Sequence, residues 1–86
     1  MMISKAAAQA LIEHSKVTGP LFVPTIVWAE NEGGVGAWEV GYHQRAIVPQ
    51  IWIEEIEGIE IVIEPHWHDK LNDKALDVVD GHFHVL

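Results

Sequence analysis

The residues best suited to chemistry are the histidines, of which the chain has six in 86 residues. Four of them form His-aromatic-His triplets at residues 66–68 and 82–84. In a β-strand, residues i and i+2 share a face about 6.5–7 Å apart, so two such imidazoles can converge on one metal ion. Zinc, nickel, copper and iron all accept imidazole nitrogen. The candidate ligands of a divalent transition metal are therefore His66, His68, His82 and His84.

The two triplets differ in how well their surroundings support a metal site. His82 and His84 follow a turn signal that places them on a strand, whereas His66 and His68 fall in a polar connection, where spacing alone fixes no geometry. A simpler interpretation is that all four are surface histidines flanking inward-facing aromatics. His-x-His also occurs in cupin metal sites, but the glutamate spacing of that class is missing. Metal binding and a small cupin-type metalloenzyme therefore stay open as alternatives.

Other groups with potential chemistry have structural explanations. The five glutamates between residues 54 and 64 fit the solvated side of strands, and nothing in the sequence places them in the cleft that acid–base catalysis needs. Glycines at 33, 34 and 36 fit a turn or bulge, because a phosphate loop needs a following helix and usually a lysine. The chain has no cysteine, which excludes disulfides and thiolate chemistry.

Net charge and hydropathy limit the classes of partner that we expect for this protein. The formal net charge is −8 with only five lysines and arginines, so we expect no nucleic acid partner, because phosphate backbones are bound through such residues. An acidic surface fits a basic protein or a cation better. No apolar run approaches the roughly 20 residues of a membrane span, and residues 1–9 do not read as a secretory signal. We expect a cytoplasmic protein that binds no membrane.

The elements that must position these residues begin with one helix. Ser4 is a plausible N-cap, and apolar residues recur behind it at intervals of three to four. Gly19-Pro20 ends the helix, since proline cannot continue it.

Beyond Pro20 the apolar residues alternate with a period of two, which indicates strands. Pro24 suggests an edge or a bulge in the first of these, because proline cannot donate to a ladder. Glu57-Gly58 and Asp80-Gly81 predict tight hairpin turns. The predicted strands cover residues 21–29, 38–42, 51–56, 59–63, 76–79 and 82–86, and residues 66–74 form a polar connection with room for one helical turn. The sequence thus predicts a single α+β domain over residues 1–86, with one N-terminal helix packed on a mostly antiparallel β-sandwich or barrel of about five to six strands.

The order of these elements resembles the HesB-like, or A-type, iron–sulfur cluster biogenesis domain. Residues 3–8 (Ile-Ser-Lys-Ala-Ala-Ala) are similar to the start of that family's helix. Residues 33–38 (Gly-Gly-Val-Gly-Ala-Trp) resemble its Gly-Gly-Cys-x-Gly-aromatic stretch. Residues 58–65, 75–81 and 83–86 follow the family's later order of an apolar strand, an apolar-Asp-apolar strand and a Gly-Phe-apolar end. The resemblance implies the fold.

The family's cluster ligands are not carried over. Its first ligand cysteine falls at Val35, and its closing Cys-Gly-Cys pair would follow Leu86. We therefore expect a non-catalytic binding or accessory domain that resembles iron–sulfur biogenesis proteins, with a protein partner or a homodimer possible. Trp52 lies on the opposite strand face from Ile51 and Ile53, so it is either core or part of such an interface.

Overall fold

The first helix begins where the sequence predicts. In the computed structural model, which describes residues 1–86, α1 spans Lys5–Thr18. The Ser4 side chain accepts a hydrogen bond of 3.0 Å from the backbone N–H of Ala7, which satisfies one orphan donor of the first turn. The helix ends at Gly19, whose φ of 86° belongs to the left-handed region that glycine adopts without strain. The N-cap and the end of the helix are confirmed.

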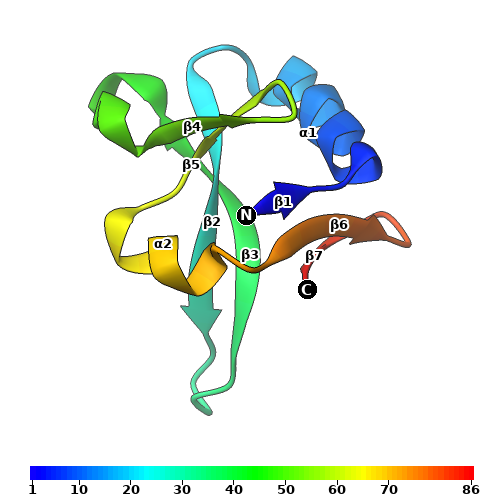
Figure 1. Cartoon of the computed structure of the whole chain (residues 1–86), viewed down its shortest axis with the longest axis vertical. Helices are drawn as coiled ribbons and strands as arrows, with labels where there is room; N and C mark the ends of the chain where they lie inside the picture. The colour runs from blue at the N-terminus through cyan, green and yellow to red at the C-terminus, as the bar shows by residue number, and fades with distance from the viewer.

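Two β-sheets and a second helix complete the fold, as Figure 1 shows. The elements before and after α1 are β1 (Met2–Ile3), β2 (Phe22–Glu30), β3 (Gly36–Gln44), β4 (Ile53–Ile56), β5 (Ile59–Val62), α2 (Pro65–Leu71), β6 (Ala75–Val79) and β7 (His82–Val85), with 3-10 turns η1 (Arg45–Ile47) and η2 (Gln50–Trp52) between β3 and β4. The larger sheet has the order β3-β2-β5-β4 and the smaller one the order β1-β6-β7.

The α+β class is confirmed, and the arrangement of strands is more mixed than expected. β1 pairs with β6 in parallel, β2 pairs with β5 in parallel, and the other three pairings are antiparallel. There are two mixed sheets and no closed barrel. The sequence could not predict β1, because a strand of two residues has no periodicity.

The predicted hairpin turns form as expected. Glu57 and Gly58 have φ values of 52° and 76°, and Asp80 and Gly81 have values of 52° and 79°. Two successive positive φ values define the turn that matches the twist of an antiparallel pair. These turns join β4 to β5 and β6 to β7 in register.

Pro24 was expected at an edge or a bulge, but it lies in β2, which is an inner strand between β3 and β5. The position is tolerated because the ladder between β2 and β5 has a single registered pair, Thr25 with Val62. There the buried Thr25 hydroxyl donates a 3.0 Å hydrogen bond to the Val62 carbonyl oxygen. A side chain thus replaces part of the backbone pairing that proline weakens.

The polar connection predicted at residues 66–74 contains α2, a helix of seven residues. Pro65, two residues after the predicted strand 59–63, is the first residue of this helix, where its fixed φ is already helical. Leu71 is fully buried and holds the helix against the larger sheet. In Figure 1, α2 lies beside the half of β2 that leads to the β2–β3 turn.

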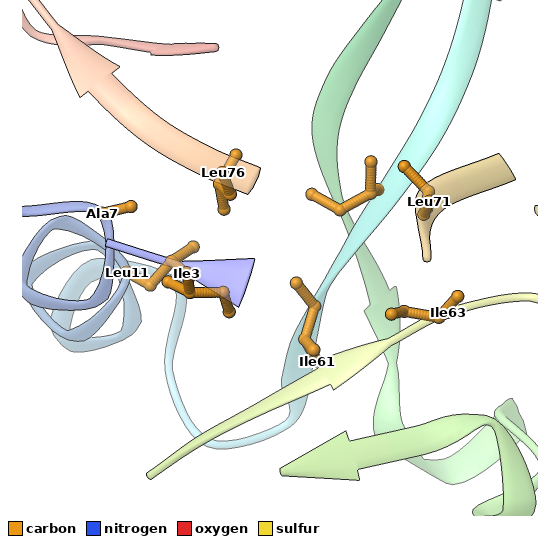
Figure 2. Close-up of a cluster of buried hydrophobic side chains, with 8 residues drawn as sticks. Ile3, Ala7, Leu11, Ile61, Ile63, Leu71 and Leu76 are labelled. Carbon is orange, nitrogen blue, oxygen red and sulfur yellow. The ribbon is translucent and has the colours of Figure 1, made fainter. Parts of the chain in front are cut away.

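The hydrophobic core is built from both sheets and both helices. Figure 2 shows residues of β1 and α1 facing side chains of β5, β6 and α2. The cluster consists of Ile3, Ala7, Leu11, Ile26, Ile61, Ile63, Leu71 and Leu76. Each is at most 5% exposed. No helix is both long and apolar enough to cross a membrane.

Candidate functional site

The first histidine pair lies on α2, not on a strand. On a helix, residues i and i+2 point about 200° apart, so His66 and His68 face different sides. The His66 ring packs against Trp67 with a centroid distance of 4.3 Å. The His68 Nε2 atom lies 3.3 Å from Glu54 Oε1 on β4. The two imidazoles of this pair therefore make separate contacts.

The second pair lies on β7, as predicted. His82 and His84 share one face of the strand and are exposed. His84 is paired in register with Asp77 of β6. No three histidine, aspartate or glutamate side chains anywhere in the chain are grouped closely enough to hold a metal ion. The four predicted ligands thus lie on two separate elements, and metal binding stays a prediction.

Asp77 itself has a structural role. The Ser4 hydroxyl donates a 2.7 Å hydrogen bond to Asp77 Oδ1, and the Val78 backbone N–H donates one of 2.8 Å. These bonds, with a smaller effect of the His84 charge, hold the pKa of Asp77 below its usual value of 3.8. Ser4 also caps α1, so one serine ties the start of the helix to β6.

The two remaining histidines are His14 on α1 and His43 on β3. The His14 Nδ1 atom is 3.1 Å from the Tyr42 hydroxyl, and its ring meets Phe83 edge-on at 5.4 Å. This contact joins α1, β3 and β7. Burial raises the pKa of Tyr42 above its usual value. Both contacts place His14 in a packing role.

Of the glutamates on β4 and β5, Glu60 is held in an ion pair. Glu60 is exposed and receives two hydrogen bonds, of 3.2 and 3.1 Å, from the Arg45 guanidinium. This bidentate pair joins η1 to β5 of the larger sheet.

A groove lined by three of the four tryptophans is the most distinctive site in the molecule. The groove, which we call the tryptophan groove, has a volume of about 550 Å³. Its lining residues are Trp28, Trp38 and Trp67, with Glu30, Asp69, Lys70, Asp73 and Lys74 on its rim. Ligand sites in proteins are typically concave, about 300–1,000 Å³ in volume and lined by aromatic side chains with a few polar groups.

The tryptophan groove lies near the turn of the β2–β3 hairpin. It is on the same face of the hairpin that packs against the core further along the strands. Trp28 and Trp38 are paired in register, two residues beyond the pair of Ile26 and Val40. Ile26 belongs to the buried core, and Trp38 packs partly against it, but the exposed fraction of Trp28 is 39%. The apolar face of the sheet therefore continues past the core to the surface.

The three rings meet edge to face. The Trp28 and Trp38 centroids are 5.1 Å apart at an angle of 72°, and those of Trp38 and Trp67 are 5.4 Å apart at 88°. Trp67 reaches Trp38 from α2, which covers one side of the groove. Edge-to-face packing is a favoured arrangement of aromatic rings, so the walls of the groove are held by one another.

Two further contacts fix Trp28. Its indole N–H donates a 3.0 Å hydrogen bond to Glu30 Oε1. Its ring lies so close to Gly36 that a Cβ atom there would be 2.3 Å from Trp28 Cζ2. Only glycine leaves room for the ring at this position. The Gly-rich segment thus seats a tryptophan, in addition to forming a turn.

Lys70 places a positive charge over this aromatic surface. Its Nζ atom lies 5.6 Å from the centroid of the Trp67 ring, within the range of a cation–π contact. The Lys70 side chain is exposed and borders the groove.

The tryptophan groove is not evident from the sequence, where Trp67 reads as an inward-facing aromatic between two histidines and Trp28 and Trp38 as alternating strand residues. The alternation in the two strands was a usable signal, since a hairpin around residues 31–34 puts Trp28 and Trp38 on opposing strands. Nothing in the sequence placed Trp67 across from them, because that contact depends on how α2 packs.

Trp52 lies outside the tryptophan groove. Strand alternation does not apply to it, because residues 50–52 form η2. It is Ile51 that is exposed, at 88%, while Trp52 is partly buried. The structure thus puts Ile51, and not Trp52, on the outer side of this turn, and the partner or homodimer stays a prediction.

Comparison with known proteins gives no family for this chain: no protein-family model matches it, and no curated protein shows significant similarity to it.

Proposed function

We propose that this protein is a non-catalytic binding domain and that the tryptophan groove is its binding site. The observation that carries the proposal is a row of three tryptophans, with Trp38 packed between Trp28 and Trp67, that lines a cavity of about 550 Å³ at the surface. Apolar side chains are normally turned inward, so a half-exposed aromatic cluster with a polar rim is typical of a ligand site.

The character of the rim supports binding over catalysis. Glu30, Asp69 and Asp73 are exposed, as is Lys70. General acid–base catalysis relies on groups whose pKa is tuned by burial or close neighbours. Solvated rim charges are better suited to selecting and orienting a ligand.

The resemblance to HesB-like domains is compatible with the same function. Val35, at the position of the family's first ligand cysteine, lies in the exposed β2–β3 turn, and its side chain is 69% exposed. An accessory role beside iron–sulfur biogenesis would then operate through ligand or partner binding by this hairpin, without a cluster carried on it.

Intrinsic fluorescence tests the proposal, since three of the four tryptophans line the site. Choline, glucose and benzoate represent cationic, neutral and anionic small ligands. We expect at least one of them to change the emission and raise the melting temperature, because a ligand of the folded state stabilises it by mass action. The double variant Trp28→Leu/Trp67→Leu should lose this response, and the matched control Trp52→Phe should keep it.

If none of the three probes acts on the wild-type protein, or if the response survives in the double variant, the tryptophan groove is not the binding site.

A further inference from the structure

We propose that the ligand of the tryptophan groove is an organic ammonium cation, and that the Lys70 ammonium group occupies its place in the free protein. The inference rests on the proposed function and adds the chemical class of the ligand and a built-in competitor. It is carried by the ring geometry, by the position of Lys70 and by the charges on the rim.

The ring geometry favours a cation. Aromatic faces attract positive charge through their quadrupole, most strongly for tryptophan, within about 6 Å of the ring centroid. Adjacent rings in the tryptophan groove are inclined at 72° and 88°. Rings at such angles form the walls of a corner, whereas a flat sugar ring stacks best on a single open face.

Lys70 shows that the site accepts an ammonium group. Its Nζ atom lies 5.6 Å from the Trp67 centroid. The two residues are three apart on α2 and are therefore neighbours on one side of the helix. The side chain is exposed, so it can leave the ring for solvent when another cation arrives.

The charges on the rim of the tryptophan groove also favour a cationic ligand. Glu30, Asp69 and Asp73 surround the groove, and when Lys70 moves away only Lys74 opposes them. The whole chain has a formal net charge of −8. This field attracts cations and repels carboxylates and phosphates, so it selects against anionic ligands of the same size.

We call the occupation of the cation site by the Lys70 ammonium group self-occupancy. It has a measurable effect on the affinity for the ligand. A ligand cation must displace this ammonium group and tolerate its charge nearby. Replacing Lys70 by methionine keeps a long flexible side chain and removes the charge. We expect this variant to bind the ligand about two- to fivefold more tightly, which is the worth of one exposed cation–π contact.

The experiment compares choline with 3,3-dimethylbutan-1-ol, its uncharged isostere of nearly the same shape, by calorimetric titration in 0.15 M salt. We expect choline to bind the wild-type protein at least about tenfold more tightly than the isostere. Lys70→Met should tighten choline binding, while the matched control Lys74→Met should change it less than about twofold, because the Lys74 charge is not on a ring and is screened. Circular dichroism verifies folding, and Lys70→Gln serves as a second neutral variant.

Each failure has a separate meaning. Equal binding of choline and its isostere, or binding of glucose or benzoate alone, overturns the cation class and leaves the groove as a binding site. Choline binding that both Lys70→Met and Lys70→Gln leave unchanged overturns self-occupancy. If no probe binds the wild-type protein, the cation class and the proposed function both fall.

Discussion

At the scale of single residues, the carboxylate of Asp77 links two parts of the chain that lie 73 positions apart, because it accepts the hydrogen bond of the Ser4 hydroxyl. Its lowered pKa makes this link sensitive to acid. A carboxyl group whose pKa is lower in the folded state stabilises the fold above its unfolded pKa and loses that effect as the pH falls through the folded value.

We therefore expect Asp77→Asn to be less stable than the wild type at pH 7. The difference in unfolding free energy should shrink as the pH falls below 3.8, the usual value of the unfolded chain, and through the lower pKa of the folded state, where the native carboxylate becomes protonated. Urea unfolding at pH 7, 5, 3.5 and 2.5 measures this. Asp80→Asn is a matched control, because Asp80 is exposed in a turn whose positive φ asparagine also adopts. A difference between wild type and Asp77→Asn that does not vary with pH would contradict the assignment.

Gly36 provides a second test at this scale. In Gly36→Ala the new Cβ atom would be 2.3 Å from the Trp28 ring, so the ring must move out of the tryptophan groove. We expect lower stability, altered tryptophan emission and loss of choline binding. Gly41→Ala on the same strand is the control, since its Cβ atom would meet Thr25 Cγ2 at an ordinary 3.7 Å. That change should be neutral or stabilise by about 0.4–1 kcal/mol. A stabilising Gly36→Ala substitution would show that Trp28 is not seated as described.

At the scale of elements, α2 is too short to be stable by itself and depends on its packing. Leu71 is fully buried beneath it. We expect Leu71→Ala to cost about 2–5 kcal/mol of unfolding free energy and to change the emission of Trp67 on the same helix. Leu71→Met should cost less than about 1.5 kcal/mol, because it conserves volume. The exposed Asn72→Ala should change stability by no more than about 0.5 kcal/mol. Urea unfolding measures all three, and equal costs for them would mean that Leu71 does not anchor the helix.

The elements predicted from sequence are those with strong local signals. Ser4 and Gly19 predict the ends of α1 because a cap acts within a few residues of the helix end. Asp80-Gly81 predicts its hairpin because the turn depends on the φ values of these two residues. The parallel pairing of β1 with β6 joins residues more than 70 positions apart and leaves no local trace. The tryptophan groove could not be predicted for the same reason, since α2 brings Trp67 to the β2–β3 hairpin only through tertiary packing.

At the scale of the whole molecule, the placement of its histidines decides what a metal could do. Two lie on α2 and two on β7, and no three potential ligands are grouped together. Structural zinc is almost always held by four protein ligands, and catalytic zinc by three. A pair such as His82 and His84 supplies two, so a bound ion would keep several water ligands and leave the folded state only weakly stabilised.

We therefore expect protein purified without a histidine tag to contain less than stoichiometric zinc, nickel, copper or iron by elemental analysis. Added Zn²⁺ should raise the melting temperature only at large excess, and His82→Ala/His84→Ala should remove that effect because these side chains share a face of β7. The control His66→Ala/His68→Ala should retain it, since those rings point to different sides of α2. Stoichiometric metal that is lost in His82→Ala/His84→Ala would contradict this expectation. It would mean that further ligands reach β7 from a second copy of the chain or from a partner, and that the histidine pair carries a function beside the tryptophan groove.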